Sequence, residues 1–350
     1  MTNSNAASGD DASRSSLAMA PISKGTFYAP HPPLSFFLDL DPPLSDFRQD
    51  ALEGLGKKQK QLSPMYFYDE RGSQLFTQIT KLDEYYVPRV EASIFDFHKD
   101  ELREAINAHQ AVFEYGSGSS TKIKKLLSIM PDPAGYVAMD ISRDFLLENA
   151  GYLANDIDLP VGAVCADFNS AISLPRVGDF KDPTWLGFFP GSTIGNLSRE
   201  DVVRLLRMAD ETLGDDAQFI VGVDLEKDAS VLRSAYNDPH GVTAAFNLNL
   251  LERLQRELNA DVRPDDFRHE IVVTNAPQTV EMHLVAQRKT DIKIGANTFE
   301  FAAGESLHTE NSHKYSLSRL DEILTQTPWR RTATFTDPNN WFAICLLSNN

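Results

Sequence analysis

Two glycines one residue apart follow an acidic residue at the end of a short apolar run. The stretch is Val112-Phe113-Glu114-Tyr115-Gly116-Ser117-Gly118-Ser119-Ser120-Thr121. Gly116 and Gly118 let the backbone turn sharply and approach a ligand closely, because they carry no Cβ atom. An amphipathic segment, residues 122–130, comes next. This order predicts a strand, a tight turn and a helix, which is the first unit of a nucleotide-binding α/β sheet.

The residues around this turn suit S-adenosylmethionine better than a dinucleotide. A dinucleotide-binding turn has a third glycine where this chain has Thr121, for close packing of helix on strand. Glu114 would repel a pyrophosphate, whereas a carboxylate there suits the sulfonium and amino group of S-adenosylmethionine. Asp140 follows the predicted second strand, where an acidic side chain can bind ribose hydroxyls.

A third predicted strand, Val161 to Cys165, leads into a carboxylate and an aromatic residue, Asp167 and Phe168, that suit an adenine amino group and ring face. Asp140 and Asp167 could also be ordinary helix N-caps, and the two roles are compatible. We therefore predict the cofactor site from the glycine turn and the two following strand ends. Its residues are Glu114, Gly116, Ser117, Gly118, Ser119, Asp140, Asp167 and Phe168.

The composition is that of an ordinary globular protein, with 350 residues, 42% hydrophobic and 24% charged. The formal net charge of -17 argues against a nucleic-acid substrate, because phosphates would be repelled. Cys165 and Cys345 lie in apolar runs and are expected to be free thiols. No apolar run approaches membrane-spanning length, and residues 1–27 resemble a disordered tail without a signal pattern. We expect a cytoplasmic monomer that does not bind membranes.

Strand-like and helical segments alternate as far as a fifth predicted strand, Gln218 to Asp224. Beyond it come a long amphipathic helix, an antiparallel meander over 270–294 and a polar, loop-like stretch, 303–315. A terminal hairpin leads into Trp341 to Leu347. The pattern predicts an α/β fold with a class I (Rossmann-like) seven-stranded methyltransferase sheet and a second, discontinuous α+β lobe. The cofactor domain is assigned to 90–226 and 316–350, and the substrate-binding lobe to 28–89 and 227–315.

Several stretches resemble the histidine Nα-methyltransferases of ergothioneine biosynthesis. They are Tyr66–Asp69, Phe76–Arg89, Glu114–Ser120, Gly191–Leu197, Gly241–Asn247 and Thr309–Ser312. The resemblance covers nearly everything from about residue 45 to the C-terminus, and the strand end 191–197 and the Thr-Glu-x-Ser stretch are not general methyltransferase features. It implies conversion of L-histidine to hercynine by three methyl transfers from S-adenosylmethionine to the α-amine, through mono- and dimethyl intermediates.

Carried over by position, the resemblance also implies a substrate pocket. Asn196 and Tyr236 would hold the substrate carboxylate, and Glu310 and Ser312 would bind the imidazole nitrogens. The α-amine would lie near three further residues, the catalytic pair Tyr68 and Tyr85 and the backbone of Gly191. Phe76 would form part of the wall, and Met282 would pack near the ring.

Three other functions stay open. Another aromatic amino acid, tryptophan or tyrosine, could be methylated on its amine, although an indole would favour a smaller or neutral residue at Glu310. A nucleotide-dependent dehydrogenase is disfavoured by Thr121 and by the lack of an obvious catalytic His or Lys motif. A non-catalytic homologue could bind the ligands without turnover. His308 and His313 flank Glu310, but their spacing matches no zinc template, so we expect no metal and two exposed loop histidines.

Overall fold

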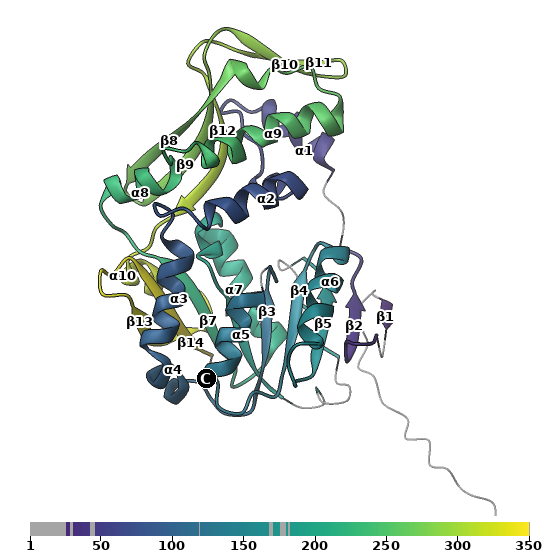
Figure 1. Ribbon diagram of the computed structural model, residues 1–350, viewed down its shortest axis with the longest axis vertical. Helices are drawn as coiled ribbons and strands as arrows, with labels where there is room; N and C mark the ends of the chain where they lie inside the picture. Colours follow the sequence, from purple (N-terminus) through teal and green to yellow (C-terminus); the bar gives the residue numbers. More distant parts are fainter. Residues whose placement is uncertain are drawn as a thin grey trace, which may run out of the picture.

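The computed structural model describes residues 26–28, 31–42, 46–118, 120–167, 171–175, 180 and 183–349. A nine-stranded sheet with helices on both faces forms one part, and a smaller part built on a three-stranded sheet lies at one end of it (Figure 1). The strand order in the large sheet is β1 (Thr26–Tyr28), β2 (Phe36–Asp39), β5 (Val161–Cys165), β4 (Gly135–Asp140), β3 (Gln110–Tyr115), β6 (Thr184–Phe189), β7 (Gln218–Asp224), β14 (Phe342–Ser348) and β13 (Arg330–Thr336).

The strands from β2 to β7 run parallel, and β14, β13 and β1 are antiparallel to their neighbours. Every residue of β3, β5 and β7 is buried, as expected for strands that helices cover on both faces. The seven strands from β5 to β13 are the sheet that the sequence predicts. The predicted α/β fold is therefore confirmed.

The N-terminal strands differ from the prediction, which placed residues 28–89 in the substrate-binding lobe and counted seven strands. Phe36–Asp39 instead pairs in parallel with β5 and extends the sheet. The ring of Phe36 occupies the space beside Gly162, where a Cβ would lie only 2.3 Å from it. A four-residue run between prolines is too short to show this pairing in the sequence, and its burial covers an otherwise open sheet edge.

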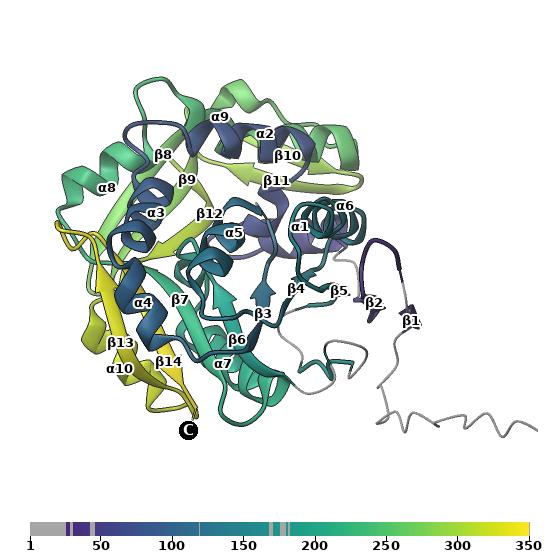
Figure 2. The same cartoon turned by 60° about the horizontal axis from the view of Figure 1, so that its bottom comes forward.

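Two helical layers cover the large sheet. One face carries α3 (Val87–Phe97), α4 (Lys99–Ala105), α5 (Ser120–Ile129) and α6 (Arg143–Ala154), and the other carries α7 (Arg199–Leu213) and α10 (Leu317–Leu324) (Figure 2). Ser198 caps α7 by accepting a hydrogen bond from the backbone N–H of Asp201. Among the described residues, no helix has both the length and the apolar character needed to span a bilayer.

The smaller part, called the lobe below, is built from segments that lie just before strand β3 in the sequence and from segments that follow strand β7. Its antiparallel sheet has the order β12 (Ser306–His313), β9 (Gln278–Ala286), β8 (Phe267–Asn275). The other lobe elements are α1 (Phe47–Leu55), η1 (Pro64–Phe67), α2 (Glu70–Ile79), α8 (Ala229–Tyr236), α9 (Val242–Leu258), η4 (Pro264–Asp266) and the hairpin β10 (Thr290–Ile294) with β11 (Asn297–Phe301).

The predicted loop over 303–315 is wrong for most of its length, because Ser306–His313 forms strand β12 beside β9. The strand contains buried polar side chains, so its hydropathy is that of a surface loop although its backbone lies in the lobe sheet. The third run of the predicted meander is also misplaced. Thr290–Ile294 pairs with β11 in a separate hairpin instead of joining β9.

Candidate active site

Strand β3 delivers Glu114 and the glycine turn to the carboxyl edge of the sheet. Glu114 is 3% exposed and accepts a 2.5 Å hydrogen bond from the hydroxyl of Tyr136. Burial raises the pKa of Glu114 to about 7, although Tyr136 and Lys122 oppose the rise. Gly116 has a φ of +74°, which L side chains rarely adopt, so the turn itself requires glycine.

The space and charge around this turn fit S-adenosylmethionine. A Cβ added at Gly116 or Gly118 would meet no heavy atom within 4 Å, so the backbone is open to close approach. Asp140 ends β4 and Asp167 follows β5, the next strand of the sheet, so carboxylates line the same edge. The N-cap of α6 is Ser142, and Asp140 accepts a hydrogen bond from its backbone N–H. The predicted residues Ser119 and Phe168 lie outside the described part of the chain.

A second turn, after β6, lies beside the first. Gly191 has a φ of +76°, and its backbone N–H donates a 2.7 Å hydrogen bond to Glu91 Oε1 on α3. The other oxygen of Glu91, which is 1% exposed, forms a 2.6 Å ion pair with Lys122 of α5. This chain of contacts fixes Gly191 relative to the helix that begins at the glycine turn. Sequence reasoning missed Glu91 and Lys122, since only the fold brings α3 and α5 together.

The short helix η3 (Thr193–Asn196) carries the chain from this turn toward the lobe. The side-chain amide of Asn196 donates a 3.2 Å hydrogen bond to Glu310 Oε1 on β12. Glu310 lies opposite Met282 of β9 in the strand register, and both side chains are buried. Burial raises the pKa of Glu310 to about 7, while Lys314 opposes the rise.

An aromatic wall connects the predicted amine and carboxylate ligands. Tyr68 packs against Phe76 at 5.6 Å between ring centroids, Phe76 against Tyr85 at 6.3 Å, and Tyr85 against Tyr236 at 6.0 Å. All three contacts are edge-on, the arrangement that the ring quadrupoles favour. Phe246 of α9 adds to this wall 5.9 Å from Tyr68; it lies in the matched stretch Gly241–Asn247, but we assigned it no role in the site from the sequence. Tyr68 is 49% exposed, so the wall opens to solvent at that end.

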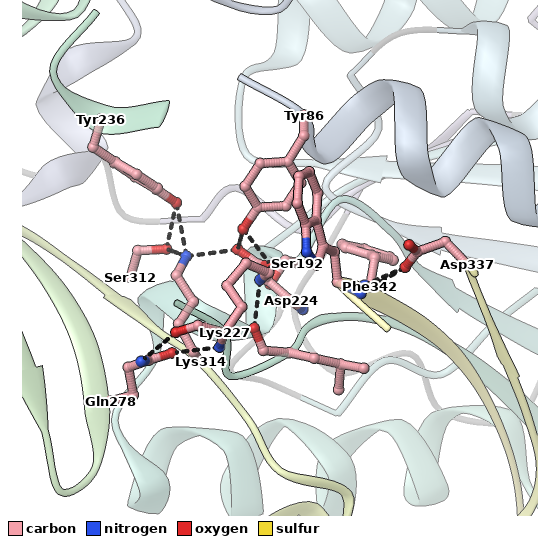
Figure 3. Close-up of polar contacts among 12 residues, drawn as sticks. Tyr86, Ser192, Asp224, Lys227, Tyr236, Gln278, Ser312, Lys314, Asp337 and Phe342 are labelled. Carbon is pink, nitrogen blue, oxygen red and sulfur yellow. Dashed lines mark hydrogen bonds and ion pairs between the residues drawn. The ribbon is translucent and has the colours of Figure 1, made fainter. Parts of the chain in front are cut away.

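The predicted ligands Tyr236 and Ser312 meet inside a buried polar cluster (Figure 3). Their hydroxyl oxygens lie 2.8 Å apart, and Lys314 Nζ donates to Tyr236 at 2.9 Å and to Ser312 at 2.8 Å. The same ammonium group forms a 2.7 Å ion pair with Asp224, the last residue of β7. Tyr86 donates hydrogen bonds to both oxygens of that carboxylate, at 2.7 and 2.9 Å.

Sequence reasoning missed this cluster, which also contains Lys227 as a second ammonium group paired with Asp224. One signal was present. Glu310, Ser312 and Lys314 alternate along one stretch, and alternate residues of a strand share a face. Burial opposes the ionisation of Asp224, but the two lysines outweigh it and hold the pKa of Asp224 below its usual value.

The prediction that His308 and His313, which flank Glu310, are exposed loop residues is wrong. Both lie on β12 and are partly buried. His308 Nε2 contacts the side chain of Asn311 at 3.0 Å, and His313 Nδ1 contacts the hydroxyl of Thr279 at 2.8 Å. Burial lowers the pKa of each imidazole below its usual value.

Comparison with known proteins shows the family to which the chain belongs. A family model described as "histidine-specific methyltransferase, SAM-dependent" matches residues 47–349. Histidine N-alpha-methyltransferase of Mycolicibacterium smegmatis is 35% identical over 320 residues, which cover 89% of this chain and 98% of that protein. The enzyme of the same name from Mycobacterium tuberculosis is 36% identical over 306 residues, covering 85% and 94%.

Solved structures include a mitomycin 7-O-methyltransferase with a TM-score of 0.44 and 13% identity, covering 87% of this chain and 69% of that one. The family match spans both the cofactor sheet and the lobe, because it begins at α1 and ends after β14. The chain belongs to the histidine-specific, S-adenosylmethionine-dependent methyltransferases.

Proposed function

We propose that this protein transfers methyl groups from S-adenosylmethionine to the α-amine of L-histidine. Three successive transfers, through the mono- and dimethyl intermediates, would give hercynine in the ergothioneine pathway. One observation carries the substrate assignment. The buried Glu310 carboxylate, with Ser312 two residues further along the same strand, faces the predicted carboxylate ligands Asn196 and Tyr236.

The ring would lie between Glu310 and Ser312. A carboxylate and a hydroxyl can bind the two imidazole nitrogens at once, and Met282, opposite Glu310, supplies an apolar contact for the ring. A ligand without these nitrogens would leave Glu310 buried without its partner, which is the arrangement that discriminates most strongly against analogues. Tryptophan has one ring N–H and a larger ring, so it satisfies this pair less well.

The substrate carboxylate would accept hydrogen bonds from Asn196 and Tyr236. Asn196 uses one amide hydrogen on Glu310 and has a second one to donate. The two residues come from different parts of the fold, η3 after β6 and the end of α8. Binding the carboxylate between them would place the α-amine toward the sheet edge, on the side of Gly191 and the glycine turn.

Methyl transfer requires in-line approach of a neutral amine to the methyl group that S-adenosylmethionine supplies, so positioning is the main contribution of the protein. Tyr68 and Tyr85 would orient the amine through their hydroxyl oxygens. Burial raises the pKa of Tyr85 well above its usual value, so at neutral pH it is a hydroxyl and not a phenolate base. The amine proton would therefore pass to water, through the open end of the aromatic wall at Tyr68.

The setting of the reaction is also part of the proposal. Both cysteines, Cys165 and Cys345, are free and buried, which suits a reducing compartment such as the cytoplasm. A single chain supplies every ligand named above, so we propose that a monomer is active.

The test is mass spectrometry of a reaction that contains S-adenosylmethionine and an equimolar pool of amino acids. We expect only histidine to gain mass, and its final product to carry three methyl groups. Methylation of tryptophan or tyrosine instead would overturn the assignment of Glu310 and Ser312 but keep the cofactor. Tight cofactor binding without any methylated product would indicate the non-catalytic homologue.

A further inference from the structure

Lys314 has no ligand role in the proposed function, yet its ammonium group contacts two of the proposed ligands. The residue is 0% exposed, and its three N–H groups are all used, on Tyr236, Ser312 and Asp224 (Figure 3). The backbone around it is held from both parts of the molecule. Lys314 N–H donates to the carbonyl of Gln278 in the lobe at 2.8 Å, and Tyr315 N–H donates to the carbonyl of Asp224 at 3.0 Å.

The number of hydrogen atoms in this cluster limits what Tyr236 and Ser312 can offer a ligand. An ammonium group only donates, so Lys314 occupies one acceptor position on each hydroxyl oxygen. The two oxygens lie 2.8 Å apart, so one hydrogen atom lies between them. Each hydroxyl has a single hydrogen, which leaves the pair with one hydrogen to donate outward and one lone pair to accept with.

Two arrangements satisfy this count. In the first, Ser312 donates to Tyr236, Tyr236 donates outward, and Ser312 accepts from the ligand. In the second, Tyr236 donates to Ser312, Ser312 donates outward, and Tyr236 accepts. A carboxylate at Tyr236 accepts hydrogen bonds only, so it selects the first arrangement. Ser312 must then accept a hydrogen bond from a ring N–H, and because the Glu310 carboxylate accepts from the other ring nitrogen, the ring binds as an imidazolium with two N–H groups.

We propose that Lys314, anchored on Asp224, is a positioning residue that couples recognition of the substrate carboxylate at Tyr236 to recognition of a ring N–H at Ser312. The assignment rests on the proposed function, because it takes the carboxylate and ring positions from there. Lys314 holds both hydroxyl oxygens on one ammonium group, so the hydrogen bond between them cannot be broken without bringing two lone pairs face to face. The site thereby favours a ligand that has both groups over ligands that have either one alone.

The coupling is measurable in the wild-type protein with four ligands and S-adenosylhomocysteine bound. Histidine has the carboxylate and the ring N–H, and histidinamide lacks the carboxylate. 4-Thiazolylalanine, in which sulfur replaces the ring N–H that faces Ser312, lacks that donor, and its amide lacks both the donor and the carboxylate. We expect the loss of affinity from imidazole to thiazole, measured by calorimetry, to be about tenfold larger for the carboxylates than for the amides. With an amide, the amide N–H can donate to Tyr236, and Ser312 can then turn its own hydrogen toward the ring, so loss of the ring N–H costs less affinity.

Three variants separate this coupling from a general structural role. In Lys314→Met the two hydroxyls can turn apart, so we expect the coupling to fall below about twofold. Lys227→Met is the matched control, because it also removes one ammonium group that pairs with Asp224. Among the described residues, Lys227 Nζ donates hydrogen bonds only to Asp224 and to the Leu225 carbonyl, so neither Tyr236 nor Ser312 loses a partner. It should keep the wild-type coupling. If Lys314→Met does not fold, Ser312→Ala is the alternative. It removes only the hydroxyl that contacts Tyr236 and Lys314, and it should also abolish the coupling.

Coupling below twofold in the wild type would overturn the inference. Equal coupling in the wild type and in Lys314→Met would also overturn it. If Lys314→Met does not fold, equal coupling in the wild type and in Ser312→Ala has the same meaning. Failure of the proposed function is a different result. A wild-type protein that does not methylate histidine overturns the proposed function, whereas one that methylates histidine without coupling overturns only the role of Lys314. Unchanged affinity for S-adenosylhomocysteine in all three variants is the check that the cofactor side is intact.

Discussion

Lys314 Nζ and Asp224 Oδ2 lie 2.7 Å apart, and both side chains are fully buried. Asp224 ends a central strand of the cofactor sheet, whereas Lys314 follows the lobe strand that carries Glu310 and Ser312. This ion pair therefore joins the two parts of the molecule at the proposed substrate site. Its geometry affects both stability and ligand binding.

Replacing Asp224 by asparagine should destabilise the protein strongly. The variant leaves the ammonium groups of Lys314 and Lys227 buried without a counter-charge, which typically costs about 3–5 kcal/mol of unfolding free energy. Tyr86→Phe is the milder companion, because it removes only the hydroxyl that donates to Asp224, at about 1–2 kcal/mol. Chemical denaturation of the three proteins checks the order, and equal stability of Asp224→Asn and wild type would contradict it.

Features that depend on neighbouring residues could be predicted from the sequence, and features that depend on distant residues could not. The glycine turn at Gly116 and the strand end at Asp140 depend on neighbouring residues, and both were predicted correctly. Strand β12 was not, because polar side chains such as Glu310 and Ser312 are buried there and give the stretch the hydropathy of a loop. The cluster of Lys314 with Asp224 joins residues 90 positions apart, and no local pattern pairs them.

Gly116→Ala should weaken cofactor binding by about tenfold or more, beyond its effect on stability. The added methyl group would meet no protein atom within 4 Å, so it would project into the space assigned to S-adenosylmethionine. Gly304→Ala is the matched control, since this lobe glycine also has a positive φ, +84°, and open space around it. Both variants should lose about 1–2 kcal/mol through backbone strain. Calorimetry with S-adenosylhomocysteine separates them, and equal affinities would place the cofactor elsewhere.

The protein should be a monomer in solution. The formal net charge of -17 opposes the approach of a second copy, most strongly at low ionic strength. Light scattering coupled to size exclusion should give a mass near 39.0 kDa. A mass twice as large that persists on dilution would show that a second chain belongs to the functional unit.

Glu310→Gln should stabilise the folded protein at alkaline pH while it weakens histidine binding. The folded protein holds the pKa of this carboxyl at about 7, above its unfolded value, so ionisation disfavours the folded state. The penalty grows as the pH rises from about 4.5 to 7 and is constant above that range. Glutamine cannot ionise, so its advantage should be small at pH 4.5 and about 1–3 kcal/mol at pH 8.

Glu305→Gln supplies the matched control, because this carboxyl lies just before the same strand and Lys60 lowers its pKa. Ionisation of Glu305 therefore favours the folded state, and Glu305→Gln should be no more stable than wild type at pH 8. Thermal denaturation at pH 4.5 and pH 8 measures both effects. Histidine affinity of Glu310→Gln should fall about tenfold, since a neutral amide replaces the charge that attracts a ring N–H. A variant with wild-type histidine affinity and no alkaline stabilisation would mean that Glu310 faces solvent and not the substrate ring.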